Sequence, residues 1–164
     1  MSVSTDQHSC LTNWQKTILV VLRFAIGWHF FYQGFGKAIS PFWTSEGYLK
    51  ASWGPFVKIA ETPWLLTIAD YTMVAGLMII GLLLMLGLFS RLAAVAGVFL
   101  LGLIYIAVPP LDYTGFVIST TQGSELYVDK NLIEILALVT VASFPTGHIM
   151  GLDILVSHWW RNRS

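Results

Sequence analysis

The sequence is poor in cysteine and in charge. Its single cysteine, Cys10, excludes an internal disulfide, a Cys-x-x-Cys redox pair and a cysteine-rich zinc site. Charged residues make up 11% of the 164 residues, against about 25% in a typical soluble domain. Nine Lys and Arg balance nine Asp and Glu, so no basic surface for nucleic acid is indicated. The sequence also lacks a Gly-rich phosphate loop, a Ser-His-Asp order and a zincin motif.

Apolar residues, in contrast, are abundant. They make up 55% of the chain, and the mean hydropathy is +0.69. A helix that crosses the hydrocarbon core of a bilayer needs about 20 mostly apolar residues. Tyr71 to Ser90 and Leu92 to Leu111 each provide 20 residues without a formal charge, and only Arg91 separates them. We therefore expect an integral membrane protein in which these two segments form a tight antiparallel hairpin.

Two weaker candidates flank this hairpin. The first contains Arg23 and His29, and the last contains Glu134. The predicted fold is thus an all-α integral membrane protein, a bundle of four transmembrane helices in one domain over residues 1–164. The expected helices are about 17–36, 66–90, 92–108 and 131–147, followed by a tail at 148–164. A signal peptide is the rival interpretation of the first helix, but Arg23 interrupts its apolar run, so we expect the helix to be retained.

The segment between the first two helices is too charged to span and unusually aromatic. Its centre, about 41–56, reads PFWTSEGYLKASWGPF. We expect an interfacial helix or re-entrant segment that caps the bundle. The alternative is a surface cap with no ligand beneath it. Four crossings put both termini on one side, and Arg91 in the shortest loop favours the cytoplasm for that side.

Polar side chains in this apolar chain are candidate site residues, because ionisable groups at membrane depth are costly. His29, Gln33 and Lys37 follow an i, i+4, i+8 spacing that puts them on one helix face. Asp70, Lys130, Asn131 and Glu134 are expected near the same membrane level. We predict catalytic roles for Glu134 and His29, and substrate binding by the others together with Arg23, which lies separately in the inner half. The predicted set is Glu134, His29, Arg23, Gln33, Lys37, Asp70, Asn131 and Lys130.

Each of these residues also has a structural interpretation. Lys37, Asp70 and Lys130 could be solvated at the interface, and Gln33 could bridge helices. Arg23 could reach the headgroups or pair with Asp153. Glu134 is harder to explain structurally, since it needs Lys37, Lys130 or His29 as a partner, or must hold a proton.

Histidine raises the question of haem or metal. A haem held between helices needs two histidines at similar depth. His29 belongs to the outer half, whereas His148 follows Pro145 at the inner end, so these two are not an axial pair. We predict no haem and no metal site. The glycines at positions 76, 81, 97 and 102 are expected to permit close helix contacts.

Four stretches resemble DoxX/DoxD-like membrane proteins, a family that includes the small subunit of thiosulfate:quinone oxidoreductase. They are RFAIGWHFFYQGFGK (Arg23 to Lys37), WTSEGYLKASWGPF (Trp43 to Phe56), DKNLIE (Asp129 to Glu134) and GLD (Gly151 to Asp153). The positions that match the family pattern are Arg23, Gly27, Gly34, Lys37, Gly47, Asn131 and Glu134. The resemblance implies a four-helix bundle in a bacterial or archaeal cytoplasmic membrane, working with a second subunit to pass electrons from thiosulfate to quinone.

The leading hypothesis is therefore a subunit of a membrane redox complex that binds quinone or a similar amphiphile beneath the cap. His29, Gln33 or Lys37 would bind a carbonyl oxygen and Glu134 would relay a proton. The expected partners are the lipid bilayer and a second protein subunit or further copies of the chain, with no nucleic acid. The alternative is a non-catalytic scaffold or accessory subunit. Transport of a small solute is a third hypothesis, and it would need an oligomer to form a pore.

Overall fold

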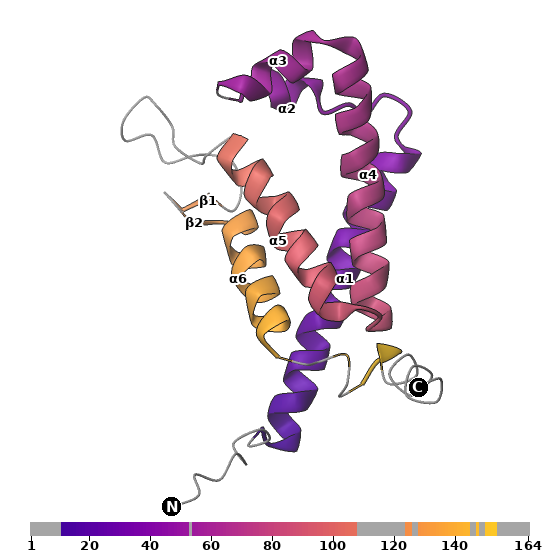
Figure 1. Cartoon of the computed structure of the whole chain (residues 1–164), viewed down its shortest axis with the longest axis vertical. Coiled ribbons are helices and arrows are strands. Elements are labelled where there is room, and N and C mark those ends of the chain that lie inside the picture. Colours follow the sequence, from indigo (N-terminus) through magenta and orange to yellow (C-terminus); the bar gives the residue numbers. More distant parts are fainter. Residues whose placement is uncertain are drawn as a thin grey trace, which may run out of the picture.

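The computed structural model describes residues 11–52, 54–107, 124–125, 128–144, 147 and 150–153. This part of the chain is almost entirely helical (Figure 1). Its elements are α1 (Asn13–Ile39), α2 (Glu46–Lys50), α3 (Pro55–Glu61), α4 (Pro63–Leu86), α5 (Ser90–Ala107), β1 (Ser124–Glu125), β2 (Val128–Asp129) and α6 (Lys130–Ser143). The two short strands pair antiparallel just before α6. The prediction of an all-α chain is confirmed for the described residues.

Three helices are long and apolar enough to cross a membrane. These are α1, α4 and α5, with 27, 24 and 18 residues. At a rise of about 1.5 Å per residue, the shortest of them is about 27 Å long, close to the hydrocarbon thickness. Helix α6 has 14 residues and falls below that length. The structure thus supports a multi-pass protein whose surroundings are a lipid bilayer.

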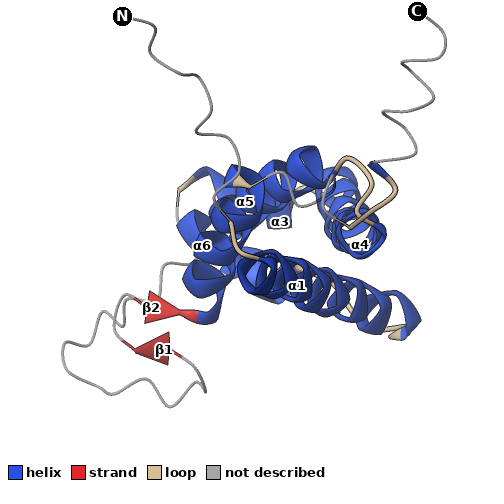
Figure 2. Ribbon diagram, turned by 90° about the horizontal axis from the view of Figure 1, so that it is seen from below, coloured by secondary structure: helices blue, strands red, loops and turns tan. Residues whose placement is uncertain are grey.

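The four longer helices close a ring. Helix α1 packs along α4 and α5 along α6, while α4 also contacts α5 and α1 contacts α6 (Figure 2). Four side chains are almost completely buried at the centre: Phe30 of α1, Leu84 of α4, and Leu138 and Val141 of α6. The first turn of α1 and the segment 150–153 lie at one end of the bundle, and α2 and α3 lie at the other (Figure 1).

Glycine allows α1 and α4 to approach closely. A Cβ at Gly81 would lie 2.5 Å from the backbone nitrogen of Phe31 and 2.7 Å from the carbonyl oxygen of Gly27. Gly97 on α5 similarly faces Leu138 of α6. The expected role in helix contact is therefore confirmed at these two positions. It is wrong for Gly102, where a Cβ would meet nothing within 4 Å.

The hairpin between α4 and α5 differs from the prediction. Helix α4 ends at Leu86, Gly87 adopts φ 65° as its C-cap, and α5 already begins at Ser90. Arg91 therefore lies in the first turn of α5, and the turn is made by residues 87–89. The apolar letters run on through this turn, so composition alone could not locate it. The left-handed conformation of Gly87, which suits a residue without Cβ, ends the helix.

The segment 150–153 is docked on this turn. The backbone N–H groups of Leu152 and Asp153 donate to the carbonyls of Leu86 and Gly87, both at 3.1 Å. In return, the Asp153 carboxylate accepts hydrogen bonds from the N–H of Phe89 at 2.6 Å and from the Ser90 hydroxyl at 2.8 Å. Asp153 thus satisfies free donors at the start of α5, although it is distant in sequence.

The expected cap is present as the two short helices α2 and α3, connected to the bundle at two points. Asp70 of α4 accepts from the backbone N–H of Ser45 at 2.7 Å and from the Thr44 hydroxyl at 3.0 Å. On the other side, the Tyr48 hydroxyl donates to the carbonyl of Ile104 at 2.5 Å. That carbonyl is one of the last four of α5, which have no partner within the helix. The cap is therefore held across the ends of both α4 and α5.

Candidate functional site

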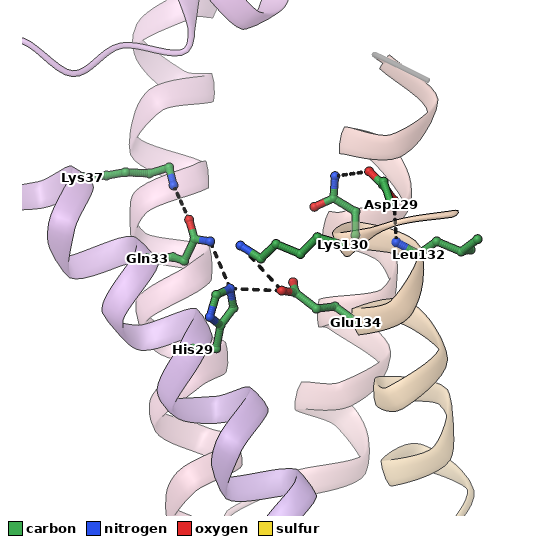
Figure 3. Close-up of polar contacts among 8 residues, drawn as sticks. His29, Gln33, Lys37, Asp129, Lys130, Leu132 and Glu134 are labelled. Atoms are coloured by element: carbon green, nitrogen blue, oxygen red, sulfur yellow. Dashed lines mark hydrogen bonds and ion pairs between the residues drawn. The ribbon is translucent and has the colours of Figure 1, made fainter. Parts of the chain in front are cut away.

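Three polar side chains of α1 form a continuous row toward the cap. The Lys37 ammonium donates to Gln33 Oε1 at 3.1 Å, and Gln33 Nε2 lies 3.0 Å from His29 Nε2 (Figure 3). The spacing of four residues places each side chain one turn above the last. Lys37 Nζ also lies 5.6 Å from the centroid of the Trp43 ring, within reach of a cation–π interaction. The row is therefore positioned by α1 itself and covered at its upper end by the cap.

The start of α6 supplies the opposing side chains. Asp129 is its N-cap and accepts from the backbone N–H of Leu132 at 2.8 Å. The other carboxylate oxygen of Asp129 accepts from the Asn131 amide at 2.9 Å. This cap fixes the first turn, from which Lys130 and Glu134 project toward α1 (Figure 3). Lys130 Nζ lies 3.7 Å from Glu134 Oε1.

The two groups meet at His29 and Glu134. His29 Nε2 lies 3.0 Å from Glu134 Oε1, which joins the first and last long helices of the bundle. The Glu134 side chain is 15% exposed and that of His29 is 39% exposed. The expectation that Glu134 needs a partner is thus confirmed, with His29 and Lys130 in contact with it. Among the described residues, Lys37 reaches Glu134 only through Gln33 and His29.

These residues line a cavity of about 320 Å³ beneath the cap. One side is polar and holds six of the eight predicted site residues: His29, Gln33, Lys37, Lys130, Asn131 and Glu134. The other side is apolar and consists of Phe30, Met73, Leu77, Leu101 and Ile104. The roof is formed by Trp43, Thr44, Ser45 and Tyr48. A cavity with one polar and one apolar wall suits an amphiphile whose head accepts hydrogen bonds.

The hydrogen bonds along the row restrict where a proton can lie. An ammonium can only donate, so Lys37 holds Gln33 with its oxygen upward and its NH₂ group toward His29. His29 Nε2 is then best used as an acceptor. Nε2 offers either one lone pair or one hydrogen, so accepting from Gln33 leaves it nothing to share with Glu134. If Nε2 carries a hydrogen instead, it can donate to Glu134, but the NH₂ group of Gln33 then faces another donor and must turn away. The contact therefore has two arrangements that differ in the position of one proton.

Two predicted site residues lie elsewhere. Asp70 binds Thr44 and Ser45 of the cap and does not line the cavity, so its contacts are structural. Arg23 is 3% exposed at the opposite end of the bundle, where Nη2 donates to the carbonyl of Met150 at 2.5 Å. Depth along the chain placed Asp70 at the correct level, but it gave no information on the direction of the side chain.

Arg23 is incompletely satisfied. Its Nε and Nη1 are buried, and neither has a hydrogen-bond partner among the residues that the structure describes. Gly87 of the α4–α5 turn packs directly against the guanidinium, since a Cβ there would lie 2.8 Å from Nη2. Asp153, the partner considered from the sequence, is close enough to act on its charge, but its carboxylate binds the turn. Arg23 therefore ties α1 to the segment 150–153.

The roof residues were missed as individual site candidates. Thr44, Ser45 and Tyr48 lie in the aromatic segment that was expected to cap the bundle, but hydroxyl side chains at an interface carry no distinctive spacing. Trp53, the second tryptophan of that segment, lies outside the described residues, as do His148, His8 and His158. Within the part of the chain that the structure describes, no three His, Cys, Asp or Glu side chains cluster in a way that could hold a metal ion.

Comparisons with protein-family models, with curated proteins and with solved structures find no match to this chain.

Proposed function

We propose that the chain crosses the membrane four times, with α6 as part of the fourth crossing. Helix α6 begins beside the cap, where Asp129 and Lys130 lie near the upper cavity. The segment 150–153 is hydrogen-bonded to the α4–α5 turn at the opposite end. The backbone between these points must traverse the height of the bundle. With four crossings both termini lie on one face, which we assign to the cytoplasm of a bacterial or archaeal cell.

We propose further that the cavity binds the head group of a quinone or a similar amphiphile. The observation that carries this proposal is the His29–Glu134 contact of 3.0 Å in the polar wall, opposite an apolar wall. A quinone ring has two apolar faces and carbonyl oxygens at its edge. It fits between Phe30 or Leu101 on one side and N–H donors such as Asn131 and Lys130 on the other. When bound, a quinone supplies two-electron chemistry coupled to protons.

The chain's own residues would bind, orient and move a proton. Lys130 and Asn131 can donate to a carbonyl oxygen, since they have N–H groups and line the cavity. His29 and Glu134 hold a proton between Nε2 and Oε1 and can exchange it at the cavity wall. The residues Trp43, Thr44, Ser45 and Tyr48 cover part of the cavity from above. Electron delivery is assigned to a second protein subunit, as the resemblance to DoxX/DoxD-like proteins implies, with a reduced sulfur compound as the donor.

The test combines binding and turnover. The purified full-length chain in lipid nanodiscs is titrated with a short-tailed benzoquinone, and tryptophan fluorescence is followed. Glu134→Gln keeps the shape of the side chain but cannot exchange a proton, so we expect binding to be retained and quinone reduction by the assembled complex to fall at least about tenfold. Ser143→Ala, an exposed change at the far end of α6, serves as the control.

Two results would overturn this assignment. One is the absence of saturable quinone binding by the chain. The other is full activity of the assembled complex with Glu134→Gln, in which case the redox chemistry resides wholly in the partner. Together they would favour the alternative, a scaffold or accessory subunit. Ion or solute flux into liposomes that depends on Glu134 would instead favour transport.

A further inference from the structure

A second cavity lies beside the first, under the same cap. Its volume is about 270 Å³, with α2 and α3 above it and α4 and α5 at its sides. It opens to the outside of the bundle, since Ile68 and Leu103 in its lining are 54% and 39% exposed. Its lining is almost entirely apolar and includes Leu49, Phe56, Ile59, Ile68, Leu103 and Ala107. Among the described residues no charged side chain lines it, and its polar ones are Ser45, Tyr48 and Thr72. The hydroxyls of Ser45 and Tyr48 already bond to Asp70 and to the Ile104 carbonyl, so the space suits a hydrocarbon group.

The two cavities adjoin. Ser45, Tyr48, Met73 and Ile104 line both of them. Tyr48 and Ile104 are joined by the 2.5 Å hydrogen bond between the phenol and the helix carbonyl, so this part of the boundary is a tyrosine held against α5. Another boundary residue is Met73, whose flexible side chain adapts to the shape of its neighbours. A chain of carbon atoms can therefore pass from the polar cavity to the apolar one by displacing side chains, while the backbone stays in place.

We propose that the apolar cavity is the tail site of the ligand whose head occupies the polar cavity. The ligand is then a single-chain amphiphile with an isoprenoid or alkyl tail, and Tyr48 marks the junction between head and tail. This inference rests on the proposed function, since it needs a head group in the polar cavity. It goes further because it specifies a long-tailed ligand and a direction, from the His29–Glu134 contact toward the cap helices.

The position of the cap supports this occupant. Asp70 and Tyr48 fix the cap across the top of both cavities, so the two spaces share one roof. Tyr48, which forms part of the roof of the polar cavity, also bounds the apolar cavity. A tail on a head group near Glu134 therefore has an apolar space next to it under the same cap. An acyl chain from a bilayer lipid has the same chemistry, and the experiment must separate the two sources.

The experiment compares two benzoquinone probes, one without a tail and one with a decyl tail, on the full chain in nanodiscs. Dissociation constants are expressed per lipid-phase concentration, so that partitioning of the tail into the bilayer cancels. We expect the decyl probe to bind about tenfold more tightly, because its tail gains packed contacts that fluid lipid does not give. Ala69→Phe fills the apolar cavity and should reduce the ratio to about one while binding of the tail-less probe is unchanged.

A matched control and a second variant accompany this test. Ala96→Phe makes the same change on the exposed side of α5, away from both cavities, and should leave both constants unchanged. Leu65→Trp fills the apolar cavity from another position. It should also reduce the ratio of the two dissociation constants to about one, and it takes the place of Ala69→Phe if that variant is unstable.

The outcomes separate the two proposals. Two results would overturn the tail site alone. In the first, the tail-less probe binds and the decyl probe binds no more tightly. In the second, the decyl probe binds more tightly, but Ala69→Phe and Leu65→Trp leave that difference unchanged. A phospholipid that copurifies with the wild type but not with Ala69→Phe, together with equal dissociation constants for the two probes, would identify the occupant as a bilayer lipid. That result would also overturn the tail site. Failure of both probes to bind would overturn the proposed function and the tail site together.

Discussion

Replacement of Gly81 by alanine should loosen the packing of α1 against α4. The added Cβ would lie 2.5 Å from the nitrogen of Phe31, 2.7 Å from the oxygen of Gly27 and 2.9 Å from Cα of Phe31. All three atoms belong to the α1 backbone, so a rotamer change cannot relieve the clash. Since non-bonded carbon contacts are optimal at about 3.5–4.0 Å, the two helices must separate by about 1 Å.

The size of the effect follows from two opposing terms. Overpacking of this kind costs about 1–3 kcal/mol. Replacing glycine by alanine inside a helix gains up to about 1 kcal/mol from propensity. Gly102 of α5 isolates the second term, because a Cβ there would meet nothing within 4 Å. We therefore expect Gly81→Ala to be less stable than Gly102→Ala by about 1–3 kcal/mol, because the gain in propensity is common to both.

The free energy of unfolding can be measured in mixed micelles by titration with sodium dodecyl sulfate, with circular dichroism as the readout. Gly102→Ala should be as stable as the wild type or slightly more stable. Equal stability of the two variants would show that α1 and α4 do not cross at Gly81, and the ring of helices that positions His29 opposite Glu134 would then be incorrect.

Three further changes test other contacts. Asp153→Ala removes the hydrogen bonds to the α4–α5 turn and should lower the free energy of unfolding by about 1–3 kcal/mol in the same titration, whereas an unchanged value would refute the docking of 150–153. Burial, and then the nearby carboxylate of Asp129, raise the pKa of Tyr48 to about 12. Stability should therefore fall as the pH rises from about 10 to 12, and Tyr48→Phe should abolish that loss. Lys37→Met removes the donor that holds the Gln33 amide, so the amide can reverse and Nε2 of His29 should gain a hydrogen. ¹⁵N NMR of labelled histidine measures this, and an unchanged tautomer would show that Lys37 does not fix the orientation of Gln33.

The apolar helices could be predicted because their signal is their length. An uncharged run of 20 residues has few folded alternatives. Helices α4 and α5 cover most of the predicted segments 66–90 and 92–108, although α4 begins at Pro63 and α5 at Ser90. The turn between them could not be placed, because the letters from Gly87 to Phe89 are as apolar as those of the helices. What fixes the turn there is the left-handed conformation of Gly87 together with the hydrogen bond that the Phe89 N–H donates to Asp153, and the latter is a tertiary contact.

The polar row of α1 was also predictable, because a spacing of four residues defines a helix face regardless of tertiary structure. The level of Glu134 followed from the same reasoning, and the fold brings it to His29. Asp70 shows the limit of this method. Position along a helix gives depth, whereas the direction of the side chain depends on how the helix is rotated in the bundle. Asp70 faces the cap backbone, whose unpaired N–H groups were not evident from the sequence.

The row and the cap together explain why a lysine lies at the membrane interface of an otherwise uncharged helix face. Lys37 cannot accept a hydrogen bond, so it fixes the orientation of the Gln33 amide, and that amide presents a donor to His29. A histidine that accepts from Gln33 uses the one lone pair of Nε2, so that nitrogen carries no hydrogen toward Glu134. The ammonium, two turns above His29, thereby favours one of the two arrangements of the His29–Glu134 contact. Because the Trp43 ring lies 5.6 Å from the Lys37 ammonium, a change in the position of the cap would also alter this restraint on Gln33.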